Sequence, residues 1–268
     1  MMDAGAVSAS IAYAARTGFR QRYHANDHAR DTVAIEPHAM AVRDARGLQT
    51  SLDDEGFALV GHTSEIADFT DRAALAERHP AEIVALLLEH TGADRVIVTS
   101  PGILRFSERS GRAGTLDNSL PARFAHVDTT AQTAAGFARA SAPEGRTFAR
   151  HAHYNVWRAF SGAPQDVPLA VCDARSVSAA DLLVADAIFD PPGGAPEWSF
   201  DSWLVAHNAA HRWHWFPAMT RDEALIFKTS DSAFANPVPH VAFDNPLGEA
   251  DWPARASIEM RAVAYWYD

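Results

Sequence analysis

The sequence predicts a mainly β protein with helices, arranged as a two-sheet jelly roll with a helical amino-terminal portion. From Phe124 to the end of the chain, short apolar and β-branched runs follow one another, and Pro/Gly clusters separate several of them. Before that point, the segment that starts at Asp71 carries apolar residues at helical spacing. Many short strands that follow a helical portion are typical of a jelly roll backed by helices.

The amino-terminal part of the chain begins without a clear pattern. Residues 1–30 are polar and alanine-rich and show no period, so we expect a loosely ordered leader. Residues 31–268 are expected to form a single jelly-roll domain, since β folds of this size are commonly single. Within it, residues 41–47 and 56–60 are predicted to be short strands joined by an acidic turn at residues 53–55.

A helical region comes next. Residues 73–76 are predicted to start one helix, and Pro80 is expected in the first turn of a second helix. Gly92 is well suited to end that second helix, and residues 95–99 are predicted to be a strand rich in β-branched residues. The apolar stripe of the second helix consists of Ile83, Val84, Leu87 and Leu88.

The rest of the chain is predicted to be mostly strands. Residues 130–140 and 178–186 are expected to be short helices between them, and residues 190–194, Asp-Pro-Pro-Gly-Gly, form the clearest loop. The candidate strands are residues 154–160, 169–173, 203–207, 211–216, 224–229, 240–243 and 257–267.

Composition limits the classes of partner. The chain has 268 residues and a formal net charge of −11, which argues against binding to nucleic acid or to an anionic membrane surface. Its one cysteine excludes an intrachain disulfide and suits a reducing cytoplasm, where we expect the protein to reside. We expect no signal peptide and no membrane helix, because no apolar run has the required form or length. The composition does not indicate an oligomeric state.

The segment Ala125-His126-Val127-Asp128-Thr129 carries the first candidate site. Residues i and i+2 of a strand point to the same face, so the His126 imidazole and the Asp128 carboxylate can meet at one point. With a second histidine they would form the two-histidine, one-carboxylate set that holds Fe(II) and leaves positions open for other ligands. The motif alone is weak, because a chain with 13 His is expected to contain about one His-x-Asp by chance. The alternative is a strand-end histidine beside a helix-capping aspartate.

Downstream residues could supply the other parts of such a site. His240 begins a short apolar strand and is the candidate second histidine. A dicarboxylate such as 2-oxoglutarate is well held by an arginine, which can grip a carboxylate with two hydrogen bonds, helped by a hydroxyl. Arg255 and Ser257 offer both groups on the next predicted strand. Arg-x-Ser occurs twice more in the chain, so the order of the motifs matters more than this single one.

Other histidines could also bind a metal. Two of them, His151 and His153, alternate along a possible strand, and metal-ligand spacing on a helix is found in His207, His211 and His214. The last of these segments, however, is predicted to be a strand, which would place His211 and His214 on opposite faces. No glutamate stands beside them as a catalytic base. We therefore expect these side chains to be ordinary hydrogen-bonded histidines.

Cysteine and tryptophan have simple explanations here. Cys172 has no histidine close by in the sequence, so a thiol nucleophile is possible but unsupported. We expect four of the tryptophans to lie in the core and not to form a platform for substrate: Trp157, Trp203, Trp213 and Trp215.

Lys228 is the only lysine in a chain whose other basic residues are all arginine. A single lysine can survive compositional drift anywhere, and most lysines are solvated. Residues 223–228, however, read as a buried strand in which Lys228 shares a face with Ala224 and Ile226. A compact ammonium suits a tight pocket in which a planar guanidinium would not fit. We therefore predict that Lys228 points into the barrel and contacts a carboxylate of 2-oxoglutarate or of the substrate.

Longer motifs resemble a known family. They are residues 126–128 followed by an alanine-rich helix, Asn155-Val156-Trp157-Arg158, residues 168–173, residues 215–228, His240-Val241-Ala242-Phe243 and Arg255-Ala256-Ser257-Ile258-Glu259-Met260-Arg261. Over residues 40–265 the chain resembles the hydroxylase/desaturase family that includes the fungal gibberellin desaturase and the cephamycin 7-hydroxylation component. One departure is Ala159, which follows Arg158 where the family has proline.

The resemblance implies a double-stranded β-helix and a non-haem Fe(II)/2-oxoglutarate-dependent dioxygenase that hydroxylates or desaturates a small molecule, often a specialised metabolite. Its cofactors would be Fe(II), 2-oxoglutarate and molecular oxygen, with His126, Asp128 and His240 as the metal ligands. Two alternatives stay open. A jelly-roll metalloprotein could use the same triad without 2-oxoglutarate, as a dioxygenase or isomerase, and a non-catalytic binding module could share the fold.

Overall fold

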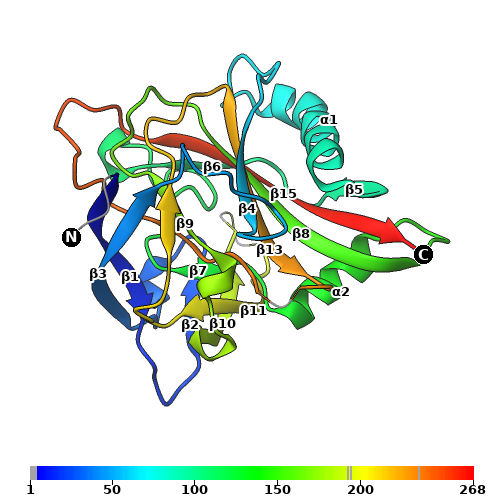
Figure 1. The fold of residues 1–268 in the computed structure, drawn as a ribbon, viewed down its shortest axis with the longest axis horizontal. Helices are drawn as coiled ribbons and strands as arrows, with labels where there is room; N and C mark the ends of the chain where they lie inside the picture. Colours follow the sequence, from blue (N-terminus) through cyan, green and yellow to red (C-terminus); the bar gives the residue numbers. More distant parts are fainter. Residues whose placement is uncertain (1–4, 192, 194, 235) are drawn as a thin grey trace.

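Two β-sheets form the body of the protein (Figure 1). The computed structural model describes residues 5–191, 193, 195–234 and 236–268. One sheet has nine strands in the order β1-β3-β12-β9-β14-β7-β11-β10-β2, and the other has six, β4-β13-β8-β15-β5, with β6 also paired to β15. The strands are β1 (Ala6–Ala14), β2 (Gln21–His24), β3 (Ile35–Asp44), β4 (Phe57–Gly61), β5 (Arg95–Val98), β6 (Ile103–Phe106), β7 (His126–Val127), β8 (Phe148–Ala159), β9 (Leu169–Cys172), β10 (Leu182–Phe189), β11 (Trp198–Val205), β12 (Trp213–Trp215), β13 (Glu223–Asp231), β14 (His240–Ala242) and β15 (Ala256–Tyr267).

From β6 onward the chain crosses repeatedly between the two sheets, as in a jelly roll. Strands β6, β8, β13 and β15 belong to the six-stranded sheet, and β7, β9, β12 and β14 belong to the nine-stranded sheet. The hairpin β10–β11 interrupts this alternation and extends the nine-stranded sheet beyond β7. Side chains from both sheets pack between them, among them Trp157, Val171 and Phe227. The prediction of a mainly β double-stranded β-helix is confirmed.

Helix α1 (Arg72–Thr91) covers the outer face of the six-stranded sheet (Figure 1). Asp71 caps its first turn by accepting hydrogen bonds from two backbone amides, and Gly92 ends it with a φ of 63°. The prediction of two helices separated at Pro80 is wrong, because α1 continues through this residue. Burial of its apolar stripe against the sheet offsets the one hydrogen bond that proline removes. None of the helices in the described part of the chain is long and apolar enough to cross a membrane.

The expected loosely ordered leader is also wrong for the described residues. Strand β1 pairs with β3 along its whole length, and Ile11 and Tyr13 are completely buried in the core cluster that covers the nine-stranded sheet. The backbone amide of Ala125 donates to the carbonyl of Ala12 at 2.8 Å, so β1 also supports the segment that leads into β7. The larger side chains Val7, Ile11 and Tyr13 stand at alternate positions of β1, but alanine and serine fill the rest of the strand, which explains why its sequence gives a weak signal.

The other predicted elements are confirmed, apart from residues 178–186, but β3 and β8 begin six residues and β11 five residues earlier than predicted. Residues Ala131–Ser141 form α2, capped by Thr130. The helix expected at 178–186 is instead a single 3-10 turn, Ala179–Asp181, followed by β10. A capping box between Ser178 and Asp181 makes the turn, and pairing with β11 and β2 then imposes the strand. The predicted loop at 190–194 lies partly outside the described residues, at Pro192 and Gly194.

Candidate metal centre and its cavities

The structure brings His126, Asp128 and His240 together. His126 opens β7, Asp128 follows two residues later, and His240 opens β14, where it is the direct cross-strand partner of His126. One ligand atom from each side chain lies within 4.8 Å of the others, and all three residues are buried. The sequence placed His126 and Asp128 on one strand and His240 on another, and the pairing of β7 with β14 explains why they converge.

Both imidazoles present the same nitrogen to this centre. Nδ1 of His126 lies 2.9 Å from the carbonyl oxygen of Phe124, and Nδ1 of His240 lies 3.4 Å from that of Val238. A proton on Nδ1 satisfies these carbonyls and leaves Nε2 with a free lone pair. Burial lowers the pKa of His126 to about 3 and also lowers that of His240. Both rings are therefore neutral near pH 7, which is the form that binds a metal ion.

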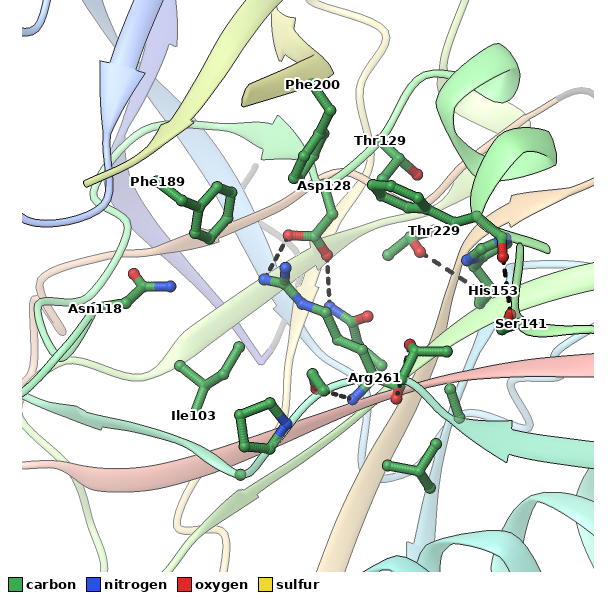
Figure 2. Close-up of a pocket in the computed structure, with 18 of the residues that line it drawn as sticks. Ile103, Asn118, Asp128, Thr129, Ser141, His153, Phe189, Phe200, Thr229 and Arg261 are labelled. Atoms are coloured by element: carbon green, nitrogen blue, oxygen red, sulfur yellow. Dashed lines mark hydrogen bonds and ion pairs between the residues drawn. The ribbon is translucent and has the colours of Figure 1, made fainter. Parts of the chain in front are cut away.

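Asp128 is held from two sides. Nη2 of Arg261 lies 2.7 Å from Oδ1, and the side-chain amide of Asn155 donates to Oδ2 at 2.7 Å (Figure 2). Burial alone would raise the pKa of Asp128, but the positive charge of Arg261 and the other contacts outweigh burial and hold that pKa below its ordinary value. The carboxylate is thus ionised and fixed in orientation before any metal ion binds.

The inner face of β15 leads to this carboxylate. Arg261 is paired with Asn155 of β8, and its Nε donates to Oε1 of Glu259 at 2.8 Å. Sequence reasoning gave no role to these three residues, although they belong to the longer motifs. The signal was present, because alternation along the predicted strand places Ser257, Glu259 and Arg261 on one face.

Arg255 and Ser257 begin the same inner face, away from the walls of the two main cavities. Arg255 is buried, its Nη1 donates to the carbonyl of Val167 at 2.9 Å, and its Nε has no hydrogen-bond partner among the described residues. Its guanidinium lies 5.6 Å from the ring centre of Trp157. The hydroxyl of Ser257 lies 3.4 Å from the carbonyl oxygen of Arg105. Burial lowers the pKa of Arg255 to about 9, and the nearby cations Arg105 and Arg123 add to this effect.

Lys228 lies on the other side of its sheet. It shares a face with Ile226, as predicted, and it is paired with Tyr154, but that face packs toward α1 and not into the barrel. Its Nζ lies 3.0 Å from Oδ2 of Asp231, a carboxylate that also binds Arg150. The predicted orientation into the barrel is therefore wrong. Strand alternation identifies which residues share a face, but it does not tell which face is the interior.

Two cavities meet at the candidate metal centre. The larger has a volume of about 620 Å³ and the smaller about 220 Å³, and Asp128 and Arg261 line both. His126 lines the smaller cavity together with Tyr23 and Arg105. The centre is thus reached from two directions, as a site that admits two different small molecules would require.

Two of the rival histidines have ordinary hydrogen-bond partners, whereas Nδ1 of His151 and Nδ1 of His214 have none among the described residues. Nε2 of His153 contacts the carbonyl of Ala134 at 2.9 Å, and Nε2 of His211 lies 3.2 Å from a carboxylate oxygen of Asp181. Among the described residues, the candidate triad is the one group of three His, Cys, Asp or Glu whose ligand atoms converge. Burial raises the pKa of the Cys172 thiol to about 12, which leaves it protonated and a poor nucleophile.

The tryptophans expected in the core are buried or partly buried, and a different, exposed tryptophan lines a cavity. Trp157, Trp213 and Trp215 are buried, as predicted, and Trp203 is partly buried. The tryptophan that lines the larger cavity is Trp198, for which the sequence pattern predicted no role. It stands in β11 after the Pro/Gly-rich loop, a position that offers no pattern from which to predict a binding surface.

Comparison with known proteins gives consistent results. A domain family described as oxidoreductase/YMDC permease-like domain matches residues 11–265. The hydroxylase/desaturase efuI of Hormonema carpetanum is 32% identical over 81% of this chain and 79% of its own. The hydroxylase/desaturase CTB9 of Cercospora beticola is 33% identical over 87% of this chain and 78% of its own. Among solved structures, the iron and alpha-ketoglutarate-dependent endoperoxidase NvfI shares the fold, with a TM-score of 0.82 and 23% identity over 98% of this chain and 99% of its own.

Proposed function

Because the chain belongs to the hydroxylase/desaturase family of Fe(II)/2-oxoglutarate-dependent oxygenases, we propose that His126, Asp128 and His240 bind Fe(II). The observation that carries the proposal is the convergence of two imidazoles and one carboxylate within 4.8 Å in a buried site. Two histidines and a carboxylate on one side of the metal are the donor set of non-haem Fe(II) oxygenases. This set leaves room for 2-oxoglutarate and oxygen on the other side.

The residues around the triad fit a resident metal ion. Both Nδ1 atoms face backbone carbonyls, so each ring already presents an unprotonated Nε2 to the centre. Neither ring therefore has to rotate or lose a proton to bind a cation. Asp128 is ionised and is held by Arg261 and Asn155. With iron and 2-oxoglutarate bound, such a site couples oxidative decarboxylation of the keto acid to removal of hydrogen from a substrate carbon, giving hydroxylation or desaturation. The protein supplies orientation and a shielded space.

Arg255 and Ser257 remain our candidates for the distal carboxylate of 2-oxoglutarate. A buried guanidinium that has only one carbonyl partner, and an Nε with none, is costly unless an anion completes it. A carboxylate of 2-oxoglutarate would supply two charge-assisted hydrogen bonds at that point. The polar stripe from Ser257 through Glu259 to Arg261 connects it to the metal centre.

The substrate is proposed to be a small molecule that enters the larger cavity. This cavity reaches Asp128, and a volume of about 620 Å³ lies within the usual range for small-molecule sites. The relatives named above carry the names hydroxylase/desaturase, which describe oxidation of a carbon substrate. Which of the two outcomes occurs depends on how the substrate carbon is placed.

An anaerobic titration tests this function. Fe(II) is added to the purified chain, then 2-oxoglutarate, while the visible spectrum is followed for the metal-to-ligand charge-transfer band that the keto acid gives when it chelates Fe(II). We expect one equivalent of each to bind and the band to appear. Iron binding without the band would overturn 2-oxoglutarate dependence and favour a jelly-roll metalloprotein of another reaction class. Failure to bind any divalent metal would favour a non-catalytic binding module.

A further inference from the structure

The hairpin β10–β11 extends the nine-stranded sheet beyond β7, so the sheet face that bears His126 continues onto the hairpin. Leu204 of β11 is paired with His126, and alternation along β11 places Phe200 and Trp198 on that same face. Across the hairpin, Phe189 is paired with Trp198. The hairpin therefore presents three aromatic side chains next to the metal centre, and none of them belongs to the strands that build the triad.

These rings form a continuous row together with Phe137 of α2. Phe189 stacks on Trp198 with ring centres 4.5 Å apart, and on Phe200 at 5.4 Å. Phe137 meets Phe200 edge to face at 5.2 Å. All four line the larger cavity, and Figure 2 shows Phe189 and Phe200 beside the Asp128 carboxylate. We call Phe137, Phe189, Trp198 and Phe200 the aromatic wall.

The aromatic wall is open to solvent at its outer end. Trp198 is 51% exposed and Phe137 is 36% exposed. Large rings clustered at the mouth of a cavity leave apolar area in water, and such a patch commonly marks a binding surface. Facing ring planes also favour flat, apolar ligands, because stacking geometry adds to the area that is buried.

The charges of the larger cavity cancel. Among its described lining residues, the charged side chains are Arg72, Asp117, Asp128 and Arg261. Asp128 and Arg261 neutralise each other. Arg72 donates to the neutral carbonyl of Gly102, and Asp117 accepts from the neutral side-chain amide of Asn26. The two positive and two negative charges of the lining residues sum to zero, so the cavity as a whole favours neither an acid nor an amine.

From these observations we infer that the aromatic wall is the specificity-determining surface for the substrate, and that the substrate is a neutral, ring-containing apolar molecule. One face of its ring system stacks on Phe189 and Phe200, and Trp198 covers its outer end. The identification of this ligand as the substrate rests on the proposed function. The binding preference itself rests on the wall and on the charge balance of the cavity.

Two fluorescent dyes of comparable size and different charge test the inference. Nile red is a neutral fused-ring dye, and 1-anilinonaphthalene-8-sulfonate is an anionic one. Both become brighter in an apolar site, so each can be titrated into the full chain. We expect Nile red to bind saturably with one site per chain, and the sulfonate to bind roughly 10-fold or more weakly, since a buried charge without a partner is costly. Equal affinity for both dyes, or no saturable binding of Nile red, would overturn the inference.

Variants localise the dye. Phe200→Ala and Trp198→Ala should each weaken Nile red binding by about 5-fold or more, because aromatic anchors dominate such contacts. Phe200→Leu retains apolar volume without a ring and should show an intermediate loss. Phe19→Ala is the matched control, since Phe19 is 59% exposed and lines neither cavity. Circular dichroism and the melting temperature establish that each variant folds. If Phe200→Ala does not fold, Trp198→Ala still tests the inference, because Trp198 is half-exposed. An effect of Phe19→Ala as large as that of Trp198→Ala would contradict the inference.

The same preparations separate this inference from the proposed function. Dye binding at the aromatic wall needs no iron, whereas the charge-transfer band needs no dye. A chain that gives the band but does not bind Nile red retains the function and loses the inference. A chain that binds Nile red at the wall but gives no band retains the binding preference, and the ligand would then no longer be identified as an oxygenase substrate.

Discussion

Asp128 depends on its neighbours more than any other member of the triad. Arg261 and Asn155 occupy one lone pair on each of its oxygens, so the carboxylate cannot turn when a metal ion arrives. Outer contacts of this kind orient the ligands of metal sites and tune affinity. Neither neighbour would bind a metal itself, so its loss should weaken metal binding less than the loss of a ligand. This difference tests the assignment of the three ligands.

The first prediction ranks the residues of the centre. Asn155→Ala should weaken Fe(II) binding roughly 10- to 100-fold, the usual effect of losing an outer contact, and His240→Ala should weaken it more. Anaerobic calorimetry with Fe(II) measures both. His214→Asn is the control, because His214 is a buried histidine outside the triad. If His240→Ala binds iron as tightly as the natural chain, the second histidine lies elsewhere.

A second prediction concerns the proposed clamp. Arg255→Ala should raise the concentration of 2-oxoglutarate needed for half-maximal charge-transfer absorbance about 10- to 100-fold, since a charge-assisted contact contributes roughly 1.5–3 kcal/mol. Ser257→Ala should have a smaller effect, because a neutral hydroxyl contributes less. Small and equal effects from the two substitutions would mean that the carboxylate is held by other groups, and Arg105 at the smaller cavity would be examined next.

Lys228 gives a third prediction, now about stability. Lys228→Ala removes one of two cations from the buried carboxylate of Asp231 and leaves Arg150, so we expect a loss of about 1–3 kcal/mol in the free energy of unfolding. The 2-oxoglutarate requirement should not change, because Lys228 faces away from the barrel interior. Urea unfolding and the charge-transfer titration measure the two quantities. An unchanged free energy of unfolding, together with a much higher 2-oxoglutarate concentration needed for the band, would instead support a contact between Lys228 and the cosubstrate.

At the scale of elements, β1 is the clearest case of a segment that tertiary contacts define. The hydroxyl of Tyr13 accepts a hydrogen bond from Nε1 of Trp213 at 2.6 Å and lies 3.1 Å from Nδ1 of His211. This links the first strand to β12. Through the bond between Ala12 and Ala125, β1 also supports the entry to β7 and therefore His126.

The fourth prediction tests this role of β1. Tyr13→Phe should lower the free energy of unfolding by about 1–3 kcal/mol, because the buried indole N–H of Trp213 loses its acceptor. Phe19→Ala, six residues along in an exposed position, should change it by less than about 0.5 kcal/mol. Both are measured by urea unfolding. Equal and negligible effects would mean that the amino-terminal strand is held loosely after all.

Local sequence was sufficient where the pattern and the tertiary structure agree. The strands from residue 154 onward have runs of apolar and β-branched side chains, and the His-x-Asp motif begins on strand β7. It was insufficient where alanine-rich segments allow either structure. Residues 182–189 contain two alanines and could be helical, but partners on both sides make them a strand. Pro80 is a strong local signal that burial against the sheet outweighs.

The candidate site divides in the same way. His126, Asp128, His240, Arg255 and Ser257 follow from motifs and their order along the chain. Asn155 and Phe200 require knowledge of which strands pair and which face is interior, and that depends on the whole sheet. The orientation of Lys228 was wrong for the same reason.

At the scale of the whole molecule, the jelly roll and its additions have different tasks. The strands β6–β9 and β12–β15, shared between the two sheets, position the triad and the Arg255 side chain. The hairpin β10–β11 and α2 add the aromatic wall outside this frame. Because the wall lies on added elements, substitutions in it can change the substrate without disturbing the metal ligands.

Buried neutral histidines also give the whole molecule a pH dependence, which is the fifth prediction. Burial lowers the pKa of His126 from 6.5 to about 3 and that of His153 from 6.5 to about 4. Between these values and pH 6.5 the unfolded chain binds protons that the folded protein does not. The free energy of unfolding should therefore be highest above pH 6.5 and should fall as the pH decreases toward 4.

The net charge acts in the opposite direction. At pH 7 the chain carries a formal charge of −11, which shrinks toward the isoelectric point of about 5.6, so repulsion between surface charges decreases as the pH falls. Salt at ~0.15 M screens this term but hardly affects the buried rings. We therefore expect the buried histidines, and not the net charge, to determine whether the free energy of unfolding rises or falls with pH. Urea unfolding of the metal-free chain at several pH values between 6.5 and 4.5 should show decreasing stability, and His153→Asn should reduce the slope by about 1.4 kcal/mol per pH unit, the effect of one proton. Stability that increases toward pH 4.5, or an unchanged slope in His153→Asn, would show that these rings are not held neutral by burial.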